Sequence, residues 1–175
     1  MKKVLVTGGA GYIGSKITSD LIKKKYQVFI VDNLSTGHKD LINKKAKFIN
    51  CNISNKTKIN NLIKINQINS VIHCAASLDV GESELNPKKY YLNNVSNTKK
   101  LLEVCSENNI KNFIFSSTCA VYGNTQGNVD ENTITKPLSV YGKTKLKCEN
   151  LLLKFSKKYN FNYAILRYFM SVGLI

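Results

Sequence analysis

An α/β fold built around a doubly wound parallel sheet is predicted by the order of patterns along the chain. Short apolar runs alternate with longer segments in which apolar residues recur at helical spacing. Strands that are joined by crossover helices in this way lie parallel in one sheet, with helices on its faces. At 175 residues the chain has the length of one domain, since domains usually contain about 100–200 residues.

The individual strands and helices follow from the same patterns. Continuous apolar runs, typical of strands buried on both faces, predict strands at residues 3–7, 27–31, 47–50, 70–75, 111–116 and 162–168. Helical spacing predicts helices at residues 15–24, 56–66, 86–108 and 140–158. Pro87 suits the first turn of the third helix, where no backbone N–H is needed. Residues 124–136 are expected to form a long loop.

A glycine cluster after the first strand predicts a dinucleotide site. Gly8, Gly11 and Gly14 lie between that strand and the first helix, where glycines permit a tight turn and let a pyrophosphate approach the helix N-terminus. Asp32 ends the second strand, at the usual distance of about 20 residues, where a carboxylate accepts hydrogen bonds from a ribose diol. Because a carboxylate repels a 2′-phosphate, NAD is favoured over NADP as the ligand of this Rossmann-type fold.

The net charge of +15 raises the possibility of nucleic-acid binding, but the distribution of the charge argues against it. Arg167 is the only arginine, whereas recognition of phosphates and grooves favours arginine forks. The lysines are spread along the chain and form no basic arm. We therefore expect no nucleic-acid partner and interpret the lysines as a solvated surface, which would still attract an anionic ligand.

The cysteines and the apolar runs indicate a reduced, cytoplasmic protein with no membrane segment and no metal site. The five cysteines are scattered without C-x-x-C spacing, which argues against a disulfide framework and a zinc site. No apolar run reaches the ~18 residues that cross a membrane. The N-terminus leads directly into a short apolar run and has no signal-peptide pattern.

Tyr141 and Lys145 are the candidate acid–base pair. Residues four apart on a helix project from one face, and a neighbouring cation lowers the pKa of a phenol. A Tyr–Lys pair can therefore act in proton transfer when a hydroxyl is presented to it. In a chain so rich in lysine the same spacing also occurs by chance, so a solvated helix face is the alternative.

His73 lies inside the fourth predicted strand, and a packed core histidine is a better interpretation than a ligand or a base. The small residues that follow it, Cys74 and Ala75, could let a flat ring approach the end of the strand.

Several motifs in order resemble the extended short-chain dehydrogenase/reductase family, and within it the UDP-glucose 4-epimerases. The resemblance covers nearly the whole chain. It is carried by Thr7-Gly-Gly-Ala-Gly-Tyr-Ile-Gly14, Asp32-Asn-Leu, Val71-Ile-His73, Val80-Gly-Glu-Ser83, Tyr90-Tyr-Leu-Asn-Asn-Val95, Phe113-Ile-Phe-Ser-Ser-Thr118, Val121-Tyr-Gly123, Tyr141-Gly-Lys-Thr-Lys145 and Leu166-Arg-Tyr-Phe169.

The resemblance implies a role for each matched position. Tyr141 would be the catalytic base and acid, Thr118 would bond the 4-oxygen of the sugar, and Lys145 would bond the nicotinamide ribose and lower the pKa of Tyr141. The cofactor-binding positions, from the glycine pattern and the resemblance together, are Gly8, Gly11, Tyr12, Ile13, Gly14, Asp32, Asn33, Asn52, Ile53, Cys74, Ala75, Ala76, Asn94, Tyr141, Lys145 and Phe169.

The implied reaction is epimerisation at C4 of a UDP-hexose through a 4-keto sugar, with NAD as cofactor and a place in galactose metabolism. A homodimer is a further expectation from the family. Members of the family are roughly twice as long, so the resemblance implies that residues 1–175 are the NAD-binding domain and that a C-terminal substrate domain is largely absent.

Three residues depart from the family pattern. Asn52 replaces the usual Asp before Ile53, Leu78 stands where some members carry Lys, and Met170 replaces an Asn that contacts the nucleotide sugar. These departures put the contacts with adenine, phosphate and substrate in question.

Two alternatives remain open. A dehydratase or decarboxylase of the same family places an acidic residue directly after the catalytic Thr, whereas Cys119 and Ala120 follow here, so an epimerase is favoured. A non-catalytic NAD-binding fragment would keep the dinucleotide crevice but fail to position substrate. We expect this chain to bind NAD with little turnover.

Overall fold

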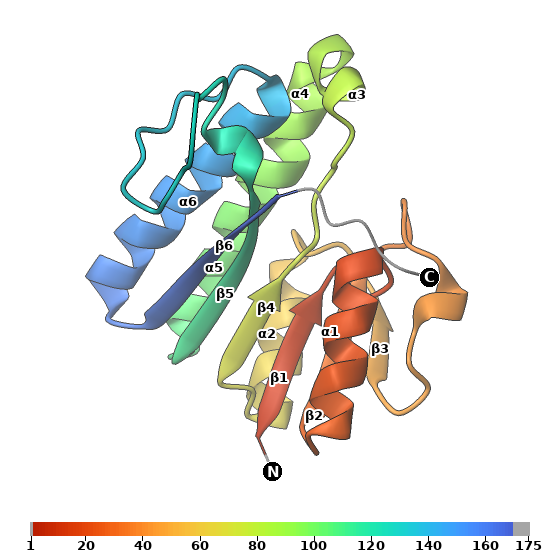
Figure 1. Ribbon diagram of the computed structural model, residues 1–175. Helices are drawn as coiled ribbons and strands as arrows, with labels where there is room; N and C mark the ends of the chain where they lie inside the picture. Colours follow the sequence, from red (N-terminus) through yellow and green to blue (C-terminus); the bar gives the residue numbers. More distant parts are fainter. Residues whose placement is uncertain (1, 170–175) are drawn as a thin grey trace.

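The computed structural model describes residues 2–169, which form a six-stranded sheet with helices on its two faces (Figure 1). All strand pairs are parallel and the spatial order is β3-β2-β1-β4-β5-β6. The strands are β1 (Lys3–Thr7), β2 (Gln27–Asp32), β3 (Lys47–Asn50), β4 (Ser70–His73), β5 (Asn112–Thr118) and β6 (Asn162–Tyr168). The predicted doubly wound α/β fold is therefore confirmed.

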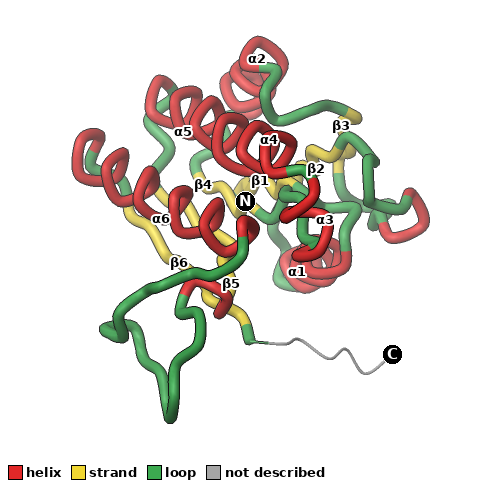
Figure 2. The backbone as a smooth tube through the Cα atoms, turned by 90° about the horizontal axis from the view of Figure 1, so that it is seen from above, coloured by secondary structure: helices red, strands yellow, loops and turns green. Residues whose placement is uncertain are grey.

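The sheet and the helices on its two faces form three layers (Figure 2). The helices are α1 (Tyr12–Lys23), α2 (Lys56–Asn66), α3 (Val80–Leu85), α4 (Pro87–Tyr90), α5 (Asn97–Glu107) and α6 (Val140–Tyr159), with 3₁₀ turns at Lys39–Leu41 and Cys119–Val121 and a π-helical segment at Tyr91–Ser96. Helices α2, α5 and α6 pack side by side on one face, whereas α1 packs against β1 and β2 on the other.

The apolar core follows this division. Alternate residues of β1 point to opposite faces, so Leu5 joins the large cluster beneath α2, α5 and α6, and Val4 and Val6 join a smaller cluster beneath α1. Against β5 and β6, the helical segments that pack closely are α6 and the 3₁₀ turn at Cys119–Val121, and Leu166 is 39% exposed. The two halves of the sheet are thus covered to different extents.

The predicted elements exist in the structure, but β4 ends at His73 and not at residue 75, and α1 begins at Tyr12 and not at residue 15. The larger difference lies in the region before α5. Residues 86–108 were expected to form one helix, but the helix consists of α4, the wider π-helical turn and α5. Pro87 stands in its first turn, as predicted. The short helix α3 was not predicted, because its six residues offer too few turns to show a helical period.

None of the helices in residues 2–169 combines the length and apolar character that crossing a bilayer requires.

Candidate active site

A pocket opens at the carboxyl ends of β1, β2 and β4, at the point where the strand order reverses between β1 and β4. In open α/β sheets this switch point is where ligands bind. The pocket is lined by Gly8, Gly11, Val31, Asp32, Asn33, Ser35, Thr36, Gly37, Cys51, Asn52, Ile53, Cys74, Ala75, Ala76, Leu78 and Asn93. Most of the positions predicted to hold the cofactor therefore come together.

The glycines of the first turn allow the backbones to lie unusually close. Gly8 has φ +72°, and a Cβ on it would lie 2.6 Å from the backbone nitrogen of Ala75. A Cβ on Gly14 would lie 2.2 Å from the carbonyl oxygen of Gly8. Side chains at these positions would therefore collide with the backbone after β4 and with the backbone of the turn itself.

Asp32 is fixed by the backbone around it. Its Oδ2 accepts a hydrogen bond from the Ala10 N–H at 3.0 Å and its Oδ1 accepts one from the Leu34 N–H at 2.8 Å. A carboxylate can accept about four hydrogen bonds, so both oxygens keep capacity for a ribose diol. The side chain lines the pocket, although only 8% of the residue is exposed.

The loop after Asp32 supplies pocket residues that the sequence interpretation missed. Asn33 Oδ1 accepts hydrogen bonds from the N–H and the hydroxyl of Ser35, and Ser35, Thr36 and Gly37 all line the pocket. The run of turn-forming residues after the acidic residue was the available signal.

The residues around the pocket fit NAD. Gly8 and Gly11 line the pocket without side chains, the N-terminus of α1 favours an anion, and the Asp32 carboxylate suits a ribose. Ile53 is an apolar residue at the wall of the pocket, suited to an adenine ring.

Tyr141 and Lys145 are buried, not solvated. Only 9% of Tyr141 and 2% of Lys145 is exposed, which excludes the alternative of a solvated helix face. The Lys145 ammonium donates a hydrogen bond to the Ser116 carbonyl at 2.8 Å and lies 5.9 Å from the centre of the Tyr141 ring. Burial raises the pKa of the Cys74 thiol, which lines the pocket, and Lys145 and Ser116 oppose that increase, so the pair adjoins the cofactor pocket.

The protonation of the pair is set mainly by burial. Burial raises the pKa of Tyr141, and hydrogen bonding with Thr118 opposes that increase. Burial lowers the pKa of Lys145. The lowering of the Tyr141 pKa by Lys145 stays a prediction: in this structure the pKa of Tyr141 is shifted by burial and by Thr118, and the Lys145 ammonium is directed to the Ser116 carbonyl.

The start of α6 is held by helix α3. The Ser139 hydroxyl caps α6 by accepting from the Gly142 N–H at 3.0 Å, as N-terminal serines do. Ser83 Oγ accepts from the Tyr141 N–H at 3.1 Å, and Glu84 Oε1 accepts from the Val140 N–H at 2.6 Å. Three of the free N–H groups at this helix end are thereby satisfied, which fixes the backbone of Tyr141.

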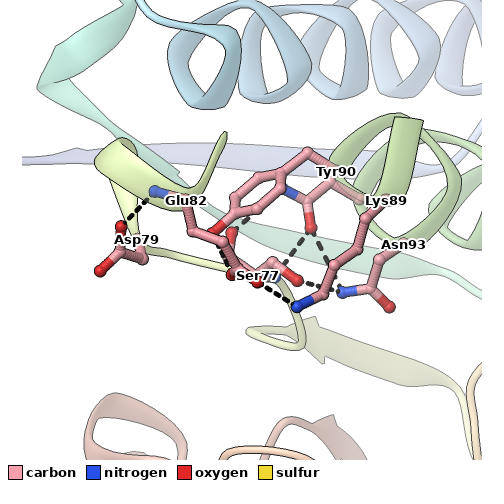
Figure 3. A network of polar contacts seen from close by, with 7 residues as sticks. Ser77, Asp79, Glu82, Lys89, Tyr90 and Asn93 are labelled. Atoms are coloured by element: carbon pink, nitrogen blue, oxygen red, sulfur yellow. Dashed lines mark hydrogen bonds and ion pairs between the residues drawn. The ribbon is translucent and has the colours of Figure 1, made fainter. Parts of the chain in front are cut away.

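Helix α3 is in turn tied to α4 (Figure 3). Asp79 accepts from the Glu82 N–H at 2.6 Å, and the Glu82 carboxylate accepts from the Tyr90 hydroxyl at 3.0 Å and from Lys89. Burial, and secondarily Glu82, raises the pKa of Tyr90 to about 12. This phenol is therefore a permanent donor that holds the two short helices together.

Asn94 joins the cofactor side of the site to α6. Its side chain accepts from the Ser77 N–H at 2.8 Å and donates to the Ser77 carbonyl and to Thr144 Oγ1, both at 3.1 Å. Its neighbour Asn93 donates to Ser77 Oγ at 3.0 Å (Figure 3). Asn94 belongs to the π-helical segment and is 1% exposed.

His73 is a packed core residue, as predicted. Its Nδ1 lies 2.6 Å from Thr7 Oγ1 and its Nε2 lies 2.8 Å from Thr98 Oγ1. Burial, with a smaller contribution from Lys145, lowers its pKa to about 3, so the ring is neutral and links β1, β4 and α5.

Some predicted positions lie outside the pocket lining. Tyr12 is 60% exposed at the start of α1, and Phe169 is 61% exposed and lines a separate hollow beside β6. Leu78, one of the departures from the family pattern, lines the pocket. Met170 lies outside the described residues.

Comparisons with known proteins agree with this geometry. The family model described as "NAD dependent epimerase/dehydratase family" matches residues 4–174. The putative UDP-arabinose 4-epimerase 4 of Arabidopsis thaliana is 39% identical over 97% of this chain and 41% of its own length. The UDP-glucose 4-epimerase of Lactobacillus helveticus is 38% identical over 98% of this chain and 52% of its own.

A solved structure extends the agreement to the backbone. The crystal structure of UDP-glucose 4-epimerase from Brucella ovis in complex with NAD is similar with a TM-score of 0.93 and 39% identity, over 97% of this chain and 52% of that one. The chain spans about half the length of the relatives that it matches. It belongs to the NAD-dependent epimerase/dehydratase family.

Proposed function

We propose that this chain is the cofactor-binding and catalytic part of a UDP-hexose 4-epimerase that interconverts UDP-glucose and UDP-galactose in the cytoplasm. The observation that carries the proposal is the buried Thr118–Tyr141–Lys145 group next to the dinucleotide pocket. Proton transfer and hydride transfer at one sugar carbon require an acid–base group and a nicotinamide at adjacent positions.

Tyr141 is the base and acid of the proposed reaction. It takes the proton of the sugar 4-hydroxyl while C4 is oxidised to a ketone, and it returns a proton when C4 is reduced from the opposite face. Bound NAD supplies the reversible hydride acceptor for these two steps. Since burial favours the neutral phenol, Thr118 and the cation of Lys145 have to stabilise the phenolate during the reaction.

Thr118 and Lys145 act on either side of the phenol. Thr118 lies close enough to Tyr141 to lower its pKa and can share its hydroxyl with the sugar 4-oxygen. Lys145 is anchored at the Ser116 carbonyl and retains further N–H donors for a ribose hydroxyl. Asp32, Asn33 and Ile53 bind the adenosine end. Positioned acid–base help of this kind typically contributes ~10²–10⁴-fold to a rate.

The choice of an epimerase over a dehydratase rests on the residues after Thr118. Cys119 and Ala120 form the 3₁₀ turn there and offer no carboxyl group to the sugar ring. The relatives include proteins described as UDP-glucose 4-epimerases and others described as UDP-arabinose 4-epimerases. Of these two kinds of substrate, we propose the UDP-hexose.

We propose further that residues 1–175 bind NAD with little turnover, because the relatives devote about as much chain again to regions that this sequence does not cover. A substrate misplaced by ~1 Å can lower a rate ~10²-fold. We also propose a homodimer, formed through a pair of helices that includes α6, the helix that carries Tyr141.

The test measures NAD binding and conversion of UDP-galactose to UDP-glucose by the purified chain. We expect binding without measurable conversion. In a version extended to the length of the relatives, Tyr141→Phe should abolish conversion and leave NAD bound. Tyr159→Phe, at an exposed tyrosine on the same helix, is the matched control. Full activity of Tyr141→Phe would show that Tyr141 is not the base of the reaction. Rapid conversion by the 175-residue chain would overturn the proposal that this chain binds NAD with little turnover.

A further inference from the structure

Glu149 continues the helix face that carries Tyr141 and Lys145. The three residues are spaced four apart on α6, so their side chains project from one side of the helix. All three are buried, and Glu149 is 1% exposed. A fully buried carboxylate is rare unless it is paired and hydrogen-bonded, which makes its partners informative.

Each of the three side chains meets the end of strand β5. Lys145 donates to the Ser116 carbonyl and Glu149 Oε1 accepts from the Ser117 hydroxyl. Thr118 is near enough to Tyr141 to oppose the rise in the Tyr141 pKa that burial causes. One helix face thus holds three consecutive residues of one strand end. The last of these residues is the proposed sugar-binding hydroxyl.

Arg167 fixes the Glu149 carboxylate in place. Its Nε lies 3.2 Å from Glu149 Oε1 and one of its terminal nitrogens lies 2.8 Å from Oε2. Arg167 is the register partner of Ser117 across β5 and β6, so the carboxylate spans both strands. A paired contact of this kind fixes orientation as well as charge.

The contacts of Arg167 continue to the long loop. Its other terminal nitrogen donates to the Tyr122 hydroxyl at 3.0 Å, and that hydroxyl donates to the Asp130 carbonyl at 2.8 Å. The guanidinium also lies 4.9 Å from the centre of the Tyr122 ring. The Glu149 carboxylate therefore belongs to a connected set of buried and half-buried contacts and is not an isolated ion pair.

Glu149 does not line the cofactor pocket but the separate hollow beside β6. Any effect that it has on the reaction must act through its neighbours. We propose that Glu149 is a positioning residue: with Arg167 and Ser117 it holds the end of β5 so that the Thr118 hydroxyl stays beside the Tyr141 phenol. This inference rests on the proposed function, because only there does the Thr118–Tyr141 contact serve the reaction.

The test measures the pKa of Tyr141 directly, by carbon NMR of the 175-residue chain labelled at the tyrosine Cζ atoms. The Tyr141 signal is identified by its loss in Tyr141→Phe. In Ser117→Ala, which leaves every charge in place, we expect this pKa to rise by roughly 0.5–1 unit, because a loosened Thr118 stabilises the phenolate less. In Glu149→Gln the loss of a negative charge opposes the same effect, so the rise should be smaller. Ser117→Ala removes a single hydroxyl and serves if Glu149→Gln does not fold.

The matched control is Glu103→Gln. It removes the carboxylate of a residue on α5 that pairs with Lys56 of α2. It should leave the Tyr141 pKa unchanged. Arg167→Lys keeps a cation beside Glu149 but lacks the fork that reaches Tyr122 as well, so it should give an intermediate shift. A loss of thermal stability in Glu149→Gln and Ser117→Ala without any shift at Tyr141 would show a purely structural role and overturn the inference.

An NAD titration of the same samples separates this inference from the proposed function. Failure of the wild-type chain to bind NAD would count against the proposed function. The dependence of the Tyr141 pKa on Glu149 would still be measured, because it needs neither cofactor nor substrate.

Discussion

The two halves of the sheet bind and position by different means. In the half formed by β1, β2 and β3, the pocket depends on close backbone approach, as at Gly8, and on a carboxylate held by backbone N–H groups. In the half formed by β4, β5 and β6, the contacts are made by buried side chains: Lys145 reaches the Ser116 carbonyl, and Glu149 pairs with Arg167. A ligand common to many proteins can be held by backbone, whereas an acid–base group needs its own buried polar contacts.

The first prediction concerns the half that depends on side chains and carries the largest expected effect. Arg167→Met leaves the Glu149 carboxylate buried without its cation, which should lower the free energy of unfolding by about 3–5 kcal/mol. Lys56→Met, which breaks an exposed pair with Glu103, should change stability little. Urea denaturation measures both. Equal losses of unfolding free energy in the two variants would show that burial of the Glu149–Arg167 pair does not increase its contribution to stability.

The second prediction concerns the half that depends on backbone approach. Gly8→Ala should lower the free energy of unfolding by about 2–5 kcal/mol, because left-handed strain adds to a clash with the backbone of Ala75. Gly127→Ala also has a positive φ, but no atom lies within 4 Å of its added Cβ. It should lose only the strain, about 1–2 kcal/mol. Urea denaturation distinguishes the two, and NAD binding should fail in Gly8→Ala alone.

The third prediction concerns the junction between the halves, where His73 links Thr7 to Thr98. The pKa of His73 is lowered from 6.5 to about 3 in the folded chain, so between these values only the unfolded chain binds the proton. Stability should therefore fall as the pH drops below 6.5, by about 2 kcal/mol at pH 5.

The control for this prediction is built from the two histidines of the chain. His73→Gln should flatten the dependence of stability on pH between 7 and 5, even if the variant is less stable at neutral pH. His38→Gln, at an exposed loop position, should keep the original slope. An unchanged slope in His73→Gln would assign the acid sensitivity to other groups.

Much of the fold could be predicted because its signals are local. The strands are short apolar runs bounded by polar residues, and β1, β3, α2 and β6 have the expected bounds. The dinucleotide pocket was predictable because it depends on a glycine turn and an acidic residue at fixed places in the sequence. Gly8 permits a close backbone approach, and Asp32 is held by backbone N–H groups. Helix α3 and the π-helical turn were missed, because neither is long enough to impose a period on the sequence.

The contacts that hold the candidate catalytic residues were not predictable in the same way. Ser83 and Glu84 cap the start of α6 from more than fifty positions away, and nothing in either segment specifies the other. The pairing of Glu149 with Arg167 requires Glu149 to be buried. The sequence does not show this, because α6 carries many other charged residues and Glu149 looks like one of them. The lowering of the Tyr141 pKa by Lys145 was predicted from spacing alone, but the balance between desolvation and charge depends on burial and on where the ammonium points.

The position of β6 has a consequence for the behaviour of the chain in concentrated solution. It is one of the two edge strands of the described sheet, so its outer edge presents backbone donors and acceptors that another strand can pair with. Tyr163 and Leu166, both more than a third exposed, add apolar surface beside that edge. The net charge of +15 acts in the opposite direction, since copies of so basic a chain repel one another and the repulsion weakens with added salt. Ionic strength therefore decides how readily two such edges meet.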